Sequence, residues 1–420
     1  MLSLEMSSTN YVGSSGSEGA RVYDSRLCLV LIPPSVIRDM PIRNVLMYVC
    51  DALRWDALPT EIAEEGVSFK TVAQSTWSPP CFTTLSTGLY PEQHGVLNWT
   101  RSLADGVETV YDIDCLDEAY YNKDPNDRLA NVYGVPQDRT IADLREPFFY
   151  LERDLITHGP YNQRVPTPLD DYLAEVTDDW GRIKSDYRKG VQMSLDLFNK
   201  RLQQLKDRGV YEDTLVIFTA DHGEILGEYG DIAHSNPTCP ELVYVPTVFL
   251  SPSLSADDFQ VDPDSEIIEQ VDVVQTALSA IGFDDITTTG VDLRSDSRDS
   301  SIGYNYIQVE KNSVPFYETR SAWDYDGGHV FHENSRLAGL LYFIHRQLRS
   351  SQRHTIRNNW RTVLEKYLYE TYSYGDPGFG PETARQFIES VSKSFDGTET
   401  SEIEISDDTR EQLKDMGYRV

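Results

Sequence analysis

Two kinds of hydrophobic pattern alternate along this chain. The segments Asn44–Cys50 and Thr214–Ala220 are almost continuously apolar, which is typical of strands buried on both faces of a parallel sheet. From Tyr187 to Leu205, apolar residues recur at spacings of three and four, and Gly209 follows where such an amphipathic helix would end. The pattern therefore predicts an α/β fold with a mostly parallel central sheet.

A carboxylate follows each apolar segment directly. Asp51 comes after the first and Asp221 after the second, where His222 is the next residue. The carboxyl ends of parallel strands form the sheet edge at which open α/β proteins bind their ligands. A carboxylate buried there costs free energy unless a cation or a hydrogen-bond donor pairs with it. The two strand ends therefore predict a divalent metal site.

The segment from Thr76 to Gly95 has the features of a nucleophile placed at the start of a short helix. Ser78 is a good N-cap, Pro79 suits the first helical turn, and Gly88 can end the helix in a left-handed conformation. The Ser78 hydroxyl would then lie beside unpaired backbone N–H groups, which attract anions such as phosphate or sulfate esters. An ordinary capped helix is the alternative for this segment alone. The acidic strand ends favour the nucleophile.

The order of these motifs resembles the sulfatase-like branch of the alkaline phosphatase superfamily, in particular a haloarchaeal-type hydrolase. The resemblance covers most of the chain and rests on Asp51-x-Leu-Arg-x-Asp, Thr-Gly-x-Tyr-Pro-x-x-His-Gly after Ser78, His158-x-Pro-Tyr, and Asp221-His-Gly-Glu. Further similar segments are Glu241–Pro246, Gln270–Thr276, Gly290–Leu293 and Leu413–Tyr418. The resemblance implies a three-layer αβα sandwich with a smaller C-terminal region.

The resemblance also implies roles for individual residues. It assigns one divalent ion to four residues, Asp51, Ser78, Asp221 and His222. A cation on the serine oxygen would lower the pKa of the hydroxyl and polarise the ester under attack. His158 and His234 match positions that contact the substrate oxygens or the leaving group, where a general acid would protonate the departing alkoxide. Asn98 is a weaker candidate for a hydrogen bond to the transferred group.

Phe82 is the most informative departure from the sulfatase pattern. Sulfatases that use formylglycine carry an Arg at this place as part of the maturation signal, so we expect no formylglycine at Ser78. An unmodified serine attacks phosphorus readily, whereas a sulfated serine would lack the hemiacetal route for release. Phosphate or phosphonate esters are therefore favoured over sulfate esters.

Two further departures concern the metal and the substrate anion. Ala52 replaces the second Asp of calcium-dependent sulfatases, and His222 replaces their usual Asn. Calcium prefers six to eight oxygen ligands, so manganese, zinc or iron would suit this set better. The Lys-x-His of many sulfatases has no counterpart here, which leaves the sulfate-binding set incomplete.

A second metal site is an alternative reading of the histidines. Asp154 and His158 are spaced like a ligand pair of the second metal in two-metal phosphatases, and His234 could complete the site. The single site is favoured because His-x-Pro-Tyr is the stronger local match, and His158 would then contact only the substrate.

Composition limits the partners and the location. With 68 acidic and 37 basic residues the net charge is −31, which excludes nucleic acid as a partner and is a poor match to an anionic membrane. The dispersed acidity is typical of proteins from a highly saline cytoplasm, and a merely acidic mesophilic protein is the alternative. No signal pattern or transmembrane segment is expected, because the longest apolar stretch near the N-terminus, Leu27–Pro33, is too short to span a bilayer. The cytoplasm is therefore the expected location.

The expected organisation is a disordered Ser- and Gly-rich tail over residues 1–20, a catalytic domain over 21–300, and a C-terminal subdomain over 301–420 that packs on it. In the last part, Leu337–Leu348 and Trp360–Tyr369 are expected to be helical. Two functions follow: a metal-dependent hydrolase of a small-molecule, glycan or lipid ester, or a non-catalytic or transferase relative that binds a phosphorylated or sulfated ligand. The oligomeric state is left open.

Overall fold

The structure is a computed structural model that describes residues 42–123, 127–137, 139–161, 167–234, 237–283, 286–311, 314–395 and 406–416. The tail expected over residues 1–20 lies outside these ranges. A seven-stranded sheet forms the centre, in the order β3 (Asp117–Asn122), β4 (Phe148–Asp154), β1 (Asn44–Cys50), β5 (Thr214–Ala220), β8 (Tyr244–Leu250), β2 (Val67–Val72) and β9 (Ile267–Glu269). The two strands predicted from their apolar character, β1 and β5, are neighbours in its middle.

The sheet is mostly parallel, as predicted, and its exception is β8. This strand runs antiparallel to both β5 and β2. The chain leaves β5 at Ala220 and re-enters the sheet at Tyr244 from the same edge, so the whole connection lies over the carboxyl end of β5. That connection carries β6 (Ile225–Leu226), β7 (Ile232–Ala233) and α8 (Pro240–Val243).

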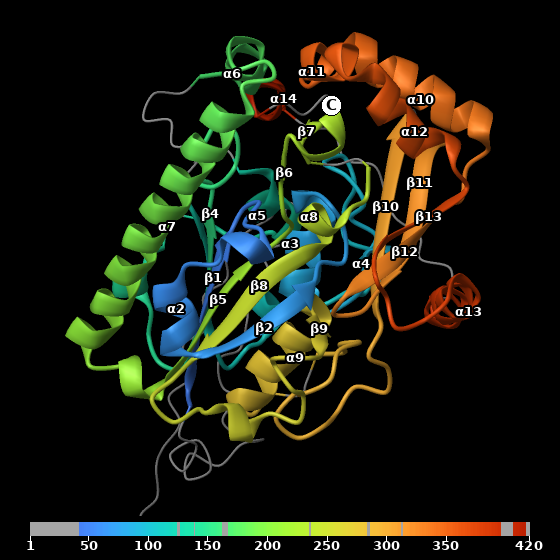
Figure 1. Ribbon diagram of the computed structural model, residues 1–420. Coiled ribbons are helices and arrows are strands. Elements are labelled where there is room, and N and C mark those ends of the chain that lie inside the picture. Colours follow the sequence, from blue (N-terminus) through green and yellow to red (C-terminus); the bar gives the residue numbers. More distant parts are fainter. Residues whose placement is uncertain are drawn as a thin grey trace, which may run out of the picture.

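Helices cover both faces of this sheet, which confirms the three-layer arrangement (Figure 1). The long helix α7 (Trp180–Arg208) packs on one face, and α3 (Ser78–Thr87) and α9 (Gln270–Ala280) pack on the other. Gly209 ends α7 with a φ of 71°, as its pattern predicted. Shorter helices complete the layers: α2 (Thr60–Glu65), α4 (Pro91–His94), α5 (Arg128–Tyr133) and α6 (Leu169–Glu175).

The C-terminal part contains a second, antiparallel sheet that the sequence did not predict. Its order is β10 (Gly303–Lys311), β11 (Val314–Trp323), β12 (Gly327–His332) and β13 (Thr371–Gly375). The helices there are α10 (Arg336–Arg349), α11 (Arg353–Asn358), α12 (Trp360–Leu368), α13 (Pro381–Ser392) and α14 (Asp407–Asp415). The helices α10 and α12 agree with the predicted ones. The second sheet shares a core with β2 and α8 through Trp323 and Val330, while the division of the chain at residue 300 stays a proposal.

Candidate active site

The two acidic residues that follow β1 and β5 lie side by side. Cys50 pairs with Ala220 across these parallel strands, so Asp51 and Asp221 leave the sheet together, and both are completely buried. The N–H of Ala52 donates to Asp221 Oδ1 at 2.9 Å. Ala52 adopts a left-handed φ of 67°, a strained conformation of the kind found at functional sites. The predicted convergence of the two carboxylates is thus present.

Ser78 is the first residue of α3, and its hydroxyl faces this carboxylate pair. Trp77 is the N-cap, so the expectation that Ser78 caps the helix is wrong. The Ser78 hydroxyl instead donates to Asp51 Oδ2 at 3.2 Å and lies 3.3 Å from His222 Nε2. The helix ends at Gly88 with a φ of 69°, as predicted. The serine is therefore held by the acidic cluster, where a nucleophile would be needed.

The atoms around Ser78 have the chemistry of a cation site. Ligand atoms of Asp51, Asp221 and His222 lie within 4.8 Å of one another. Asp51 Oδ1 and Asp221 Oδ2 are buried with no hydrogen-bond partner among the described residues. His222 Nδ1 lies 2.8 Å from the Gly223 carbonyl, so its Nε2 carries the lone pair that faces the two carboxylates. A divalent ion would satisfy these orphaned atoms together.

The two carboxyls titrate in opposite directions. Burial raises the pKa of Asp221, and the negative charge of Asp51 raises it further. Burial would also raise the pKa of Asp51, but Arg153 and the nearby imidazoles outweigh it and hold that pKa well below its usual range. Without a cation, two buried carboxylates this close favour only one full negative charge.

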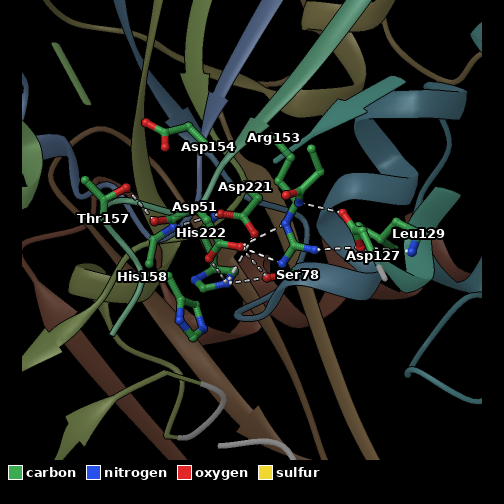
Figure 2. A network of polar contacts seen from close by, with 12 residues as sticks. Asp51, Ser78, Asp127, Leu129, Arg153, Asp154, Thr157, His158, Asp221 and His222 are labelled. Carbon is green, nitrogen blue, oxygen red and sulfur yellow. Dashed lines mark hydrogen bonds and ion pairs between the residues drawn. The ribbon is translucent and has the colours of Figure 1, made fainter. Parts of the chain in front are cut away.

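Arg153 on β4 is a site residue that the sequence reasoning missed (Figure 2). Its Nη2 and Nε donate to Asp51 Oδ2 at 2.7 and 3.1 Å, and its Nη1 lies 3.1 Å from Asp127 Oδ1. The guanidinium stacks 4.8 Å from the centre of the Phe82 ring and 5.7 Å from Trp99. The signal was the three consecutive charged residues at the end of a buried strand. Arg153 thus brings a cation next to Phe82, the position at which formylglycine sulfatases carry their own Arg.

Three imidazoles form a row beside Ser78. The ring of His234 lies 4.5 Å from that of His222 and 4.9 Å from that of His158, measured between ring centres. His234 Nδ1 donates to Glu224 Oε2 at 2.9 Å, and the other oxygen of Glu224 accepts the Tyr161 hydroxyl at 2.6 Å. The structure therefore places the predicted His158 and His234 in one cluster with His222, the imidazole that contacts Ser78.

Asp154 points away from this row, which corrects the two-metal reading. Neighbouring residues of a strand face opposite sides of a sheet, so Arg153 faces the site and Asp154 faces α7. Asp154 Oδ2 accepts hydrogen bonds from the Tyr48 hydroxyl, at 2.7 Å, and from Ser194. Its Oδ1 accepts the N–H of Ile156 at 3.0 Å. A second metal held by Asp154, His158 and His234 does not fit this geometry.

Asn98 and Cys81 do not join the site chemistry. The Asn98 side chain donates to Glu310 Oε2 at 3.1 Å and accepts the N–H of Thr100 at 2.8 Å, so both ends of its amide are used elsewhere. Cys81 lies one helical turn after Ser78 and is completely buried, and this burial raises the pKa of its thiol well above its usual value. Ser78 is therefore the better nucleophile of α3.

Comparison with known proteins agrees with this geometry. Residues 139–283 match the Sulfatase family model. The low-salt glycan biosynthesis sulfotransferase Agl7 of Haloferax volcanii is 27% identical over 405 residues, covering 89% of this chain and 96% of that protein. A 2-O GAG sulfatase has a TM-score of 0.55 at 14% identity, covering 80% of this chain and 95% of its own. The phosphonate monoester hydrolase of Agrobacterium radiobacter has a TM-score of 0.54 at 16% identity, covering 69% and 87%. These findings confirm the resemblance to the sulfatase-like branch of the alkaline phosphatase superfamily and its fold.

Proposed function

We propose that this chain, which has the fold of the sulfatases and phosphonate monoester hydrolases, is a metal-dependent enzyme that cleaves a phosphate, phosphonate or sulfate ester with Ser78 as nucleophile. The observation that carries the proposal is the Ser78 hydroxyl, 3.2 Å from Asp51 Oδ2 and 3.3 Å from His222 Nε2. The orphaned oxygens of Asp51 and Asp221 beside it support a cation at the same place.

The metal would be held by Asp51, Asp221, His222 and the Ser78 oxygen. When bound, a divalent ion supplies Lewis-acid chemistry, which lowers the pKa of the serine and polarises the ester. Two carboxylates and one imidazole suit manganese, zinc or iron better than calcium. The single-metal reading is retained, because Asp154 faces α7.

The protein residues account for the positioning of the nucleophile and the protonation of the leaving group in an in-line displacement. Asp51 Oδ2 accepts the hydrogen bond of the Ser78 hydroxyl and orients it. Ser78 loses its proton to solvent water, and its Oγ forms a bond to phosphorus or sulfur while the bond to the leaving oxygen breaks. The leaving oxygen takes a proton from His234, whose Nδ1–H is fixed on Glu224, so that Nε2 is the atom that delivers it. Burial lowers the pKa of His158, which suits a neutral contact to the substrate.

Arg153 is proposed as a positioning residue. Its two hydrogen bonds fix Asp51 Oδ2, and its charge keeps that carboxylate ionised for metal binding. It acts on the reaction through Asp51.

The ester is proposed to be a phosphate or phosphonate, because Phe82 stands where the maturation Arg of formylglycine sulfatases would be. Group transfer is the second candidate, and the relative named as a glycan biosynthesis sulfotransferase, aligned over 89% of this chain, favours it. In that reaction a glycan hydroxyl, rather than water, would take the group from Ser78. Transfer to an acceptor hydroxyl would also remove the sulfate group from a sulfated Ser78, which lacks the hemiacetal that formylglycine enzymes use for this release.

The test is metal analysis of the protein purified in high salt, followed by assays on phosphate monoester, phosphate diester, phosphonate and sulfate esters with and without a glycan acceptor. We compare wild type with Ser78→Ala and with Ser86→Ala, a buried serine of the same helix. Ser78→Ala should lose at least about 10³-fold in kcat, whereas Ser86→Ala should keep most activity.

Each outcome has a defined meaning. Equal activity in wild type and Ser78→Ala would refute the nucleophile. Products formed only with the acceptor would select the transferase, and a metal-loaded protein inactive on every ester would select the non-catalytic binder. Mass spectrometry of the Ser78 peptide tests the expected lack of formylglycine.

A further inference from the structure

The exposed large apolar side chains are concentrated in one segment. Among the described residues, every one of them lies on α10, on α12 or directly after α12: Leu337, Leu341, Ile344, Leu348, Trp360, Leu368 and Tyr369. Leu337 and Leu348 are 66% and 60% exposed. Scattered surface leucines are ordinary, but a contiguous set marks an interaction surface.

The apolar positions of α10 form a narrow stripe. At about 100° per residue, Leu337, Leu341, Ile344 and Leu348 fall within an arc of roughly 60°. The opposite side of the helix carries Tyr342 and Phe343, which pack in a core with β10, β11, α11 and α12. The helix therefore has two apolar faces, and only one of them is covered. In Figure 1, α10, α11 and α12 lie together at one end of the second sheet.

This segment also reverses the charge of the chain. Residues 336–369 contain seven Lys or Arg residues and one acidic residue, whereas the whole chain has 37 basic and 68 acidic residues. Arg336, Arg349, Arg357 and Arg361 are exposed, and Arg336 pairs with the exposed Glu370 at 3.3 Å. Arg336 and Arg349 lie on opposite sides of the apolar stripe, each roughly 110° from its centre by the same helical geometry. An exposed apolar stripe between basic side chains is the pattern of a helix that lies in a membrane interface.

We infer that α10, α11 and α12, the docking helices, bind an anionic lipid surface. The leucines and Ile344 would enter the acyl boundary, and the arginines would contact lipid phosphates. Trp360 and Tyr369, at the ends of α12, are the aromatic residues preferred at the headgroup level. Among the described residues no helix is long and apolar enough to cross a bilayer.

Charge decides between lipid and a second copy of this chain. In a dimer, the docking helices of two copies of the chain would face each other and bring like charges together, which costs free energy. Anionic headgroups instead complement the basic side chains. The net charge of −31 opposes approach to the same headgroups, but salt screens it within a few ångströms at high ionic strength, and apolar insertion is not screened. The poor match expected from the average charge therefore does not apply to this face.

The docking helices are tied to the active-site connection. Arg346, on the covered side of α10, lies 2.6 Å from Asp231 Oδ2 and donates to the Tyr367 hydroxyl at 2.6 Å. Asp231 directly precedes β7, and His234 directly follows it. Docking would therefore bring the connection that carries His234 close to the lipid surface.

Vesicle flotation tests the inference. The full chain is mixed with phosphatidylglycerol or phosphatidylcholine vesicles at low and at high KCl. Wild type should float with the anionic vesicles and bind the neutral ones at least about tenfold more weakly. Leu341→Asp combined with Ile344→Asp should weaken binding at least about tenfold at both salt concentrations. The control changes Gln192→Asp and Asn199→Asp, at exposed positions on α7, add the same negative charge and should not weaken vesicle binding.

A charge-reversal pair separates the two contributions. Arg349→Glu with Arg361→Glu should weaken binding at low KCl by at least about tenfold and have a smaller effect at high KCl. Lys189→Glu with Lys200→Glu on α7 is the matched control. All changed side chains are exposed, so the variants should keep the wild-type thermal transition.

Three results would overturn the inference: no flotation with anionic vesicles, flotation that the Leu341 and Ile344 changes leave intact, or a dimer by analytical ultracentrifugation that these changes dissociate. The last result would assign the face to a second copy. Ser78→Ala should float like wild type, so failure of this inference and failure of the proposed reaction are read separately.

Discussion

Replacing Arg153 by Met should destabilise the protein more than any change of a surface ion pair. The side chain is 2% exposed, and its partners Asp51 and Asp127 are 0% and 2% exposed. Removing one partner of a buried pair costs about 3–5 kcal/mol, because a buried charge is left without compensation. The lost stacking on Phe82 adds about 0.5–2 kcal/mol.

The expected change in melting temperature follows from the size of the chain. Unfolding entropy of about 2.1 cal/mol/K per residue over 420 residues gives about 0.9 kcal/mol/K. The ion-pair loss of about 3–5 kcal/mol together with the stacking loss of about 0.5–2 kcal/mol then lowers the melting temperature by roughly 4–8 °C. The assay is differential scanning calorimetry of the metal-free protein in EDTA at pH 7.

Arg182→Met is the matched control. Arg182 pairs with Glu175 at 2.9 Å, and their side chains are 41% and 64% exposed, so the pair should contribute less than about 1 kcal/mol. A double-mutant cycle with Asp127→Asn adds a second check. Asp127 also accepts from Asn122 at 2.7 Å and from the N–H of Leu129 at 3.1 Å, so the single change Asp127→Asn should itself destabilise, because an amide NH2 group cannot accept the hydrogen bond from Asn122.

Saturating manganese should narrow the difference between Arg153→Met and wild type, because a divalent ion also compensates Asp51. A melting temperature within about 1 °C of wild type for the metal-free Arg153→Met protein would refute the reasoning, since the expected loss is several times larger. A coupling energy near zero between positions 153 and 127 would show that the pair does not act as one unit.

Three further outcomes are expected. Manganese at a hundred times its Kd should stabilise wild type by about 2.7 kcal/mol in calorimetry but leave the stability of Asp221→Asn unchanged. Without metal, Asp221→Asn should be at least as stable as wild type, because the change removes the repulsion from Asp51. A less stable metal-free variant would contradict the charge argument. Burial lowers the pKa of His94 to about 3, so as the pH falls from about 6.5 the unfolded chain binds a proton before the folded chain does, and stability is lost. In urea unfolding, His94→Gln should be less stable than wild type at pH 7.5 and should approach wild type at pH 5. A difference in free energy of unfolding that is the same at both pH values would exclude this titration. Gly223→Ala would place a Cβ 2.0 Å from the Glu241 carbonyl oxygen and should destabilise by about 1–3 kcal/mol or more, whereas Gly181→Ala, with its nearest contact at 3.7 Å, should be neutral or stabilising.

The sequence predicted the parts of the site that depend on buried strands. Continuous apolar segments identified β1 and β5, and strand ends that lie side by side brought Asp51 and Asp221 together. Local capping rules failed at Ser78, because the hydroxyl finds a stronger partner in Asp51 than in the backbone of its own helix. The helices expected over Leu337–Leu348 and Trp360–Tyr369 are likewise present as α10 and α12.

Other features depend on contacts between distant segments. Spacing suggested Asp154 as a ligand, but because side chains along β4 alternate between the two faces of the sheet, Arg153 faces the site instead. The stacking of Arg153 on Phe82 joins β4 to α3, which no local pattern reveals. The second sheet was missed because its strands mix polar and apolar residues and are covered partly by helices that come later in the chain.

The stacked pair of Arg153 and Phe82 restricts how this active site can evolve or be redesigned. A formylglycine site would require Phe82→Arg, because a serine can itself be the modified residue, but an Arg at position 82 would meet the guanidinium that now lies 4.8 Å from the Phe82 ring centre. Two like charges in a buried space are unfavourable, so the exchange also requires a neutral residue at position 153. Each substitution alone passes through a less stable protein. The two catalytic designs are therefore separated by coordinated changes at positions 82 and 153, so a single substitution at position 82 would be disfavoured.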